Sequence, residues 1–117
     1  MKFEIEQKDS YAILALKTDR LDSKVAPDLK SQIILLANSS DQNDLIVDLE
    51  SVNFADSSGL SALLMAHRMY RDSDRTLVLC GLQERISKLL EISQLDDIFV
   101  TSKNRDGALE YINQTEE

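Results

Sequence analysis

A repeated change between two hydrophobic periods is the feature that most constrains how this chain can fold. Two runs, DLIVDLE at 44–50 and TLVLCGL at 76–82, are short, apolar at their centres and contain β-branched residues, as buried strands do. After each run, apolar residues recur every three to four positions, which is typical of an amphipathic helix. Because strands that alternate with helices need crossover connections, this pattern predicts a mostly parallel sheet.

The remaining segments extend the pattern to the order β-β-α-β-α-β-α-β-α. KFEIEQ at 2–7 alternates apolar and charged residues, and with YAILALK at 11–17 it predicts an antiparallel hairpin. Helices are expected after Ser23, a candidate cap with Pro27 tolerated in the first turn, and after Asp56. The other expected elements are a polar loop at 38–44, a helix at 83–93, a short strand at 98–101 and a helix with a polar tail at 104–117. The sequence thus predicts an α/β fold, one domain over 1–117, with a mixed sheet of about five strands and about four helices.

The composition argues against several classes of protein. A formal net charge of −8 opposes binding to nucleic acid or to an anionic membrane, because both repel an acidic surface. Cys80 is the one cysteine, which rules out an internal disulfide or a cysteine-rich zinc site, and its apolar surroundings predict a buried, inert thiol. No apolar run approaches the ~20 residues of a membrane helix, and the first residues do not resemble a signal peptide. We therefore expect a cytoplasmic protein with no cofactor and with neither nucleic acid nor membrane as partner.

The junction VDLESVNFADSSGL, at 47–60, places two hydroxyls where a strand passes into a helix. The first N–H groups of a helix have no partner inside it, so Asp56 or Ser57 can cap them, and loss of such a cap costs ~1 kcal/mol. A phosphate on Ser57 would meet the same N–H groups and the helix dipole. Gly59, early in the helix, indicates that another stretch of backbone approaches closely. Capping and phosphate binding both remain open on these residues alone.

A third possibility, a nucleophilic serine, fits the sequence poorly. A nucleophile elbow needs glycine two residues before the serine, but Ala55 and Asp56 occupy those positions for Ser57 and Ser58. His67, the one histidine, lies about 13–15 Å further along the helix by helical rise, beyond hydrogen-bond reach. The sequence therefore does not predict an enzyme.

The helix after Asp56 has two apolar arcs on opposite sides. One arc is Leu60, Leu63 and Leu64 around His67, and the other is Ala62, Met65, Ala66 and Met69. A surface helix needs only one apolar stripe, so the second predicts either deep burial or a face for a partner. Methionines and small residues would suit an adaptable docking surface, and they also suit a core.

The segment VDLESVNFADSSGLSALLMAHR resembles the signature of the STAS domain, the fold of sulfate-transporter tails and bacterial anti-sigma factor antagonists. LDSKVAPDLK at 21–30 resembles the start of that family's first helix, and LVLCGLQERISKLLEISQLDDIF is similar to its later strand, helix and final motif. The family often has a glycine two residues before the LD pair, where this chain reads KTDRLD. The short N-terminus and the lack of apolar spans disfavour a transporter tail.

The resemblance implies a partner switch in bacterial signal transduction and transcription regulation. It implies that an anti-sigma factor, itself a serine kinase with a histidine-kinase-like ATPase fold, phosphorylates Ser57, and that a PP2C-type phosphatase reverses this. The unphosphorylated form would bind the kinase, and the phosphoprotein would release it. The alternative is an unphosphorylated STAS adaptor subunit of a lipid-transport or signalling complex. The predicted site comprises Ser57 as phosphosite, Asp56, Ser58 and Gly59 beside it, and partner contacts at Asp22, Leu60, Ala62, Met65 and Met69.

Overall fold

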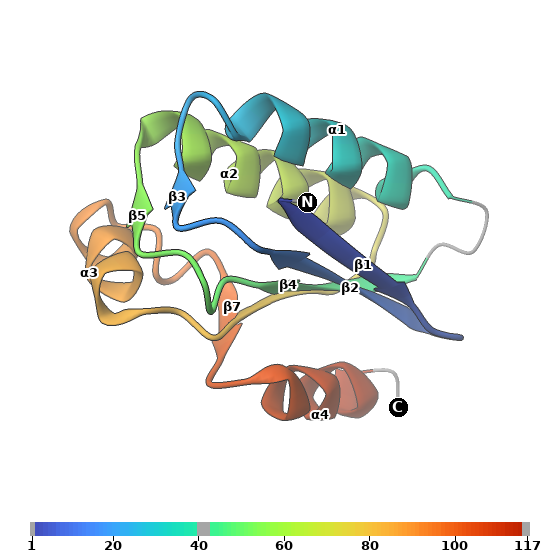
Figure 1. Cartoon of the computed structure of the whole chain (residues 1–117). Coiled ribbons are helices and arrows are strands. Elements are labelled where there is room, and N and C mark those ends of the chain that lie inside the picture. Colours follow the sequence, from blue (N-terminus) through green and yellow to red (C-terminus); the bar gives the residue numbers. More distant parts are fainter. Residues whose placement is uncertain (1, 40–42, 116–117) are drawn as a thin grey trace.

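The computed structural model describes residues 2–39 and 43–115, and these form three layers (Figure 1). The elements in chain order are β1 (Phe3–Gln7), β2 (Tyr11–Leu16), β3 (Arg20–Leu21), α1 (Ala26–Ala37), β4 (Asp44–Asp48), β5 (Phe54–Ala55), α2 (Ser57–Asp72), β6 (Leu77–Cys80), α3 (Glu84–Ile92), β7 (Val100–Ser102) and α4 (Arg105–Thr115). Helices α1 and α2 cover one face of the central sheet, α3 lies at one end, and α4 covers the opposite face.

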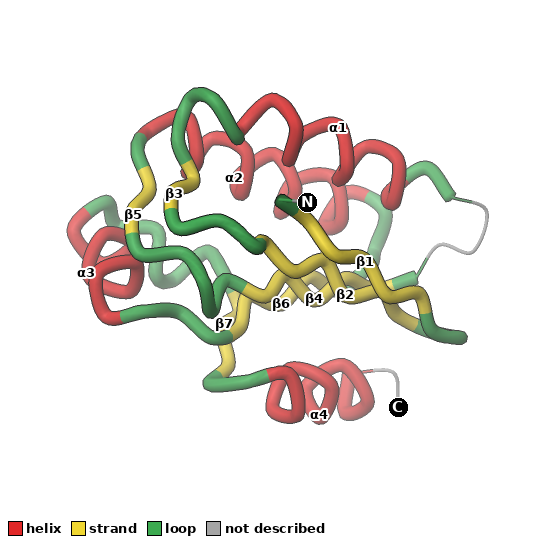
Figure 2. The backbone as a smooth tube through the Cα atoms, in the orientation of Figure 1, coloured by secondary structure: helices red, strands yellow, loops and turns green. Residues whose placement is uncertain are grey.

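The central sheet has five strands in the order β1-β2-β4-β6-β7 (Figure 2). β1 is antiparallel to β2, and all the other neighbouring pairs are parallel. This arrangement confirms the predicted α/β fold with an N-terminal hairpin and a mostly parallel sheet. β4 and β6 are buried along their full length because helices cover both sides of the sheet.

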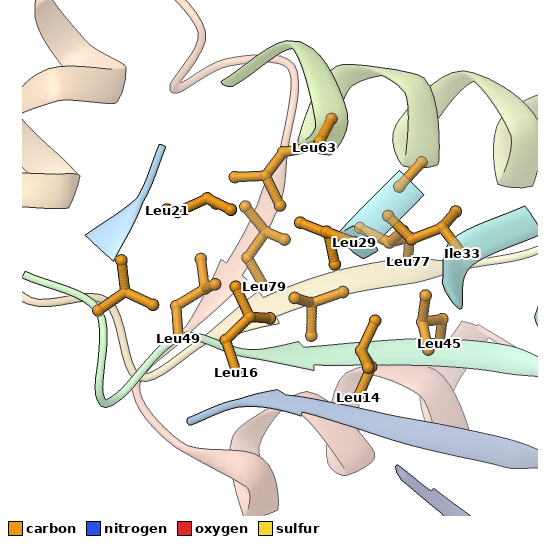
Figure 3. Packing of buried hydrophobic residues seen from close by; sticks show 14 of the residues in the cluster. Leu14, Leu16, Leu21, Leu29, Ile33, Leu45, Leu49, Leu63, Leu77 and Leu79 are labelled. Atoms are coloured by element: carbon orange, nitrogen blue, oxygen red, sulfur yellow. The ribbon is translucent and has the colours of Figure 1, made fainter. Parts of the chain in front are cut away.

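The main core lies between the sheet and the helices α1 and α2. Leu29 and Ile33 of α1 and Leu63 of α2 point toward leucines of the sheet, among them Leu14 and Leu45 (Figure 3). Successive strand residues face opposite sides, so the neighbours of these leucines build a second cluster under α4. That smaller cluster consists of Ile13, Ile46, Val78, Cys80, Ala108 and Ile112. Cys80 is confirmed as a buried thiol, and burial followed by the nearby carboxylate of Asp48 raises its pKa to about 12.

A small second sheet was missed by the sequence analysis. β3 and β5 pair in parallel, with Arg20 opposite Phe54 and Leu21 opposite Ala55. Strands of two residues show no hydrophobic period, so nothing in the sequence pattern marks them. Their pairing holds the loop before α1 against the start of α2, where the two serines lie (Figure 2).

The predicted start of α1 at Ser23 is wrong. The helix begins at Ala26, Val25 is its N-cap, and within the described residues no side chain caps it. The backbone carbonyl of Asp22 accepts the N–H groups of Val25 and Ala26 at 3.0 and 2.8 Å, so a turn of backbone takes the place of the cap. Pro27 lies in the first turn as predicted. The predicted loop at 38–44 and the polar tail lie partly outside the described residues.

Candidate functional site

Asp56 provides the cap of α2. Its backbone is extended, its Oδ1 accepts the N–H of Gly59 at 3.0 Å, and its carbonyl accepts the N–H of Leu60 at 3.0 Å. Of the two candidate caps, the acid therefore takes the role, and Ser57 becomes the first residue of the helix.

Ser57 is exposed, and its side chain does not stabilise the fold through a hydrogen bond to any described residue. Its hydroxyl makes no hydrogen bond to any residue that the structure describes, and neither do the backbone N–H groups of Ser57 and Ser58. These two N–H groups point out of the first turn, where the helix dipole favours a negative charge. Ser58 is half-buried beside it. A group attached to the Ser57 oxygen would thus meet solvent and two unpaired donors.

Gly59 lies where α2 touches the small sheet. A Cβ atom at this position would collide with the backbone oxygen of Leu21 and stand 2.7 Å from its Cγ. The Asp56 N–H donates to the same Leu21 oxygen at 3.3 Å. The expected close approach of another backbone at Gly59 is confirmed, and Leu21 is its source.

The close packing of Leu21 brings its neighbour Asp22 to the same end of α2. Asp22 accepts the N–H of Lys24 at 3.1 Å and lies 3.5 Å from Nε of Arg20. Desolvation would raise the pKa of the Asp22 carboxyl, but the N–H groups of Lys24 and Val25 together with the Arg20 guanidinium hold that pKa below its usual value. Asp22 is therefore a carboxylate at neutral pH, close to the proposed phosphosite.

A groove of about 580 Å³ runs along the outward face of α2. Ser57 lies at its beginning, and its walls are mostly apolar with a few charged residues. The lining residues are Ser57, Leu60, Ser61, Leu64, Met65, Arg68, Met69 and Asp72 of α2, Lys30 of α1 and Leu95 beyond α3. The structure thus brings the serine together with three of the residues that were predicted to contact a partner: Leu60, Met65 and Met69.

Ala62, also predicted to contact a partner, does not line this groove. Ala62 has 0% of its surface exposed and belongs to the core together with Gly59, Leu63, Ala66 and Tyr70. The small side chains let α2 lie close to α1 and the sheet. In the arc that contains the two alanines, the alanines therefore lie in the core and the methionines line the groove. The groove also has residues that were not predicted to contact a partner. Lys30 and Leu95 come from other segments, so no local pattern marks them, whereas Ser61 and Leu64 lie on α2 itself.

His67 has a packing role. Its ring meets the ring of Phe99 edge to face, with the centroids 5.7 Å apart. Burial, followed by the charges of Arg71 and Arg68, lowers the pKa of the imidazole, so it is neutral at pH 7. Ser57 lies ten residues away on the same helix, about 15 Å by helical rise, so His67 cannot take a proton from it.

Comparison with known proteins agrees with this geometry. The family model described as STAS domain matches residues 2–108. An anti-sigma-B factor antagonist of Listeria monocytogenes is 30% identical over 109 residues, 93% of this chain and 94% of the relative. A STAS-domain anti-sigma-factor antagonist from Planctomyces limnophilus has a similar structure, with a TM-score of 0.86 at 15% identity over 95% of this chain and 97% of that one. The Bacillus cell fate determinant SpoIIAA in its phosphorylated form gives a TM-score of 0.72 at 18% identity, over 94% and 98% of the two chains.

The chain therefore belongs to the STAS domain family. Within that family it groups with the bacterial anti-sigma factor antagonists, which are regulatory proteins. None of the helices in the described part of the chain combines the length and the apolar character needed to cross a membrane.

Proposed function

We propose that this protein is an anti-sigma factor antagonist whose binding to its partner is controlled by phosphorylation of Ser57. The unphosphorylated form binds an anti-sigma factor that is a serine kinase with a histidine-kinase-like ATPase fold, and so frees a sigma factor. The kinase phosphorylates Ser57 and is released, and a PP2C-type phosphatase resets the cycle. The protein binds rather than catalyses, and it acts in the cytoplasm.

The observation that carries this proposal is the position of Ser57. Its hydroxyl is exposed at the first residue of α2, Asp56 has taken over the capping role, and the mostly apolar groove begins at the same place. A phosphate can therefore be added without breaking a hydrogen bond that the fold needs. The curated relatives named as antagonists of an anti-sigma factor, and the phosphorylated SpoIIAA among the structural neighbours, support the same role.

The release step follows from electrostatics. We place the docked partner over Leu60, Met65 and Met69 in the groove, with Asp22, Asp56 and Ser58 at its rim. A phosphate on Ser57 adds about −1.5 to −2 charges beside the carboxylates of Asp22 and Asp56. A partner group that packs against the unmodified serine without water would then face concentrated negative charge. Every ~1.4 kcal/mol of binding free energy lost in this way reduces the affinity tenfold.

Incubation with candidate kinases and ATP, followed by intact mass and peptide mapping, tests the proposal. We expect one phosphate on Ser57 of the wild type and none on Ser57→Ala. In pull-downs with ATP, Ser57→Ala should stay bound, Ser57→Asp should bind weakly even without ATP, and the control Ser87→Ala, at an exposed position of α3 outside the groove, should behave as wild type. Equal retention of wild type and Ser57→Ala under phosphorylating conditions would contradict the switch. No phosphate gain together with tight binding to a transporter ATPase would support the adaptor role instead.

A further inference from the structure

Arg20 lies beside the start of α2 with most of its hydrogen-bonding capacity unused. Its guanidinium carbon is 4.1 Å from the centre of the Phe54 ring, and its Nε lies 3.5 Å from Oδ2 of Asp22. The side chain is 58% exposed, and its terminal amino groups have no hydrogen-bond partner among the described residues. A guanidinium offers a planar fork of donors that suits a phosphate, and this fork is open.

The small sheet aims this guanidinium toward the end of the strands where Ser57 lies. Arg20 of β3 lies opposite Phe54 of β5, and Asp22 and Asp56 directly follow the ends of these two strands. The contact with Asp22 shows that the guanidinium extends along the strand, away from its own Cα and toward α2. Phe54 and Ser57 are three positions apart, which is at most about 11 Å of extended chain. A phosphate on Ser57 would extend toward the same space.

We propose that Arg20 is a positioning residue that receives the phosphate of phosphorylated Ser57 and, in doing so, leaves the Phe54 ring and the Asp22 carboxylate. This inference rests on the proposed function, because it concerns the modified serine. Asp22 offers this largely exposed guanidinium a single carboxylate contact at 3.5 Å, which is a weak kind of ion pair. The phosphate offers a larger charge and three acceptor oxygens in a geometry that matches the guanidinium fork.

The exchange would rearrange the rim of the groove as well as adding charge to it. Phe54, already 37% exposed, would lose the guanidinium that covers its face, and Asp22 would lose its cationic neighbour. A partner that had docked against the Arg20–Phe54 stack and a neutralised Asp22 would then meet a different surface. Phosphorylation would thus weaken the interface at β3 and at α2 in one step.

A phosphorus NMR titration of the protein with genetically encoded phosphoserine at position 57 tests this directly. The second pKa of a phosphoserine is ordinarily about 6. The acids Asp22 and Asp56 raise it, whereas Arg20 and the free N–H groups lower it. We expect the pKa in Arg20→Gln to be higher than in wild type by about 0.5, with Arg20→Lys in between, because lysine keeps the charge and loses the fork. Arg71→Gln is the matched control. It removes an equally exposed arginine near the far end of α2, which also has an aspartate neighbour, and should leave the pKa unchanged.

A second measurement keeps the test valid if Arg20→Gln folds poorly. In wild-type protein, the Nε–H signal of Arg20 in nitrogen-edited NMR should shift on phosphorylation, and that of Arg71 should not. Equal phosphate pKa values in wild type, Arg20→Gln and Arg71→Gln, or an unmoved Arg20 signal, would overturn the inference. Because the phosphoserine is installed during synthesis, this result does not depend on a kinase. Failure of every kinase to modify Ser57 would contradict the proposed function, and failure of the titration alone would remove only the role of Arg20.

Discussion

Asp56 and Ser57 could each have capped α2, and in the structure the aspartate is the cap while the serine stays available for modification. The aspartate accepts the Gly59 N–H at 3.0 Å and fixes the first turn of α2, while the serine hydroxyl remains free of hydrogen bonds among the described residues. A site for reversible modification benefits from this division, since the group that changes carries no part of the fold.

The division of tasks predicts unequal effects of two alanine substitutions. Asp56→Ala removes the acceptor of the Gly59 N–H and should lower the free energy of unfolding by about 1 kcal/mol. Ser57→Ala removes no hydrogen bond within the described structure, so its effect should stay within about 0.5 kcal/mol. Urea unfolding of the two variants and the wild type checks this. If Ser57→Ala costs as much as Asp56→Ala, the hydroxyl shares the cap, and phosphorylation would have to disturb the helix.

Gly59 and Gly107 form a second informative pair, since both lie in helices. Gly59→Ala drives a methyl group into the Leu21 backbone oxygen, which cannot move without separating β3 from α2, so we expect a loss of about 1–3 kcal/mol. At Gly107 the nearest neighbour of an added Cβ is Ser102 Cβ at 3.4 Å, an ordinary contact. Gly107→Ala should therefore gain about 0.5–1 kcal/mol from helix propensity. Opposite signs in thermal or urea unfolding would confirm the close approach at Gly59, and a stabilising Gly59→Ala would refute it.

Helix α2 shows what the hydrophobic period of a sequence can predict and what it cannot. DSSGL correctly located its start, and each of its two apolar arcs has residues in the core and residues in the groove. The hydrophobic period could not say which residues of an arc face the core, because methionine, leucine and alanine count alike in it. Packing against the rest of the fold decides the question: Gly59, Ala62 and Ala66 are buried where the helix approaches closely, and the large side chains of Leu63 and Tyr70 are buried with them. The β3–β5 pair and the walls of the groove depend on residues far apart in the chain, so no local pattern could reveal them.

The division of α2 into a core side and a groove side leads to a prediction on binding. Met65 lines the groove and is only partly buried, so Met65→Glu should lower affinity for the kinase partner at least about tenfold and change stability by about 1 kcal/mol or less. Ala62 is fully buried, so Ala62→Glu places an unpaired charge in the core and should unfold the protein. Isothermal titration beside circular dichroism melting separates the two effects. If Met65→Glu melts like Ala62→Glu, the methionine belongs to the core.

The groove and helix α4 lie on opposite sides of the central sheet. The groove lies on α2, whereas α4 covers the other face over its own small apolar cluster (Figure 1). Arg105 joins α4 to the sheet: its Nε lies 2.6 Å from Oδ2 of Asp48, whose side chain is 7% exposed, and its Nη1 lies 3.9 Å from Oε1 of Glu6 in β1. Stability that comes from α4 should therefore be separable from binding at α2.

Arg105→Ala tests that separation. The substitution leaves Asp48 buried without its cation, and we expect a loss of about 2–3 kcal/mol, below the cost of a fully buried pair because Arg105 is itself 36% exposed. Lys88→Ala, which breaks the exposed Lys88–Glu84 pair at 3.2 Å, should change stability by less than about 0.5 kcal/mol. At a temperature where both variants are folded, each should bind the kinase partner and accept phosphate on Ser57 as the wild type does. A folded Arg105→Ala variant that binds poorly would mean that the partner reaches across the sheet edge to α4, and the interface would then extend beyond the groove on α2.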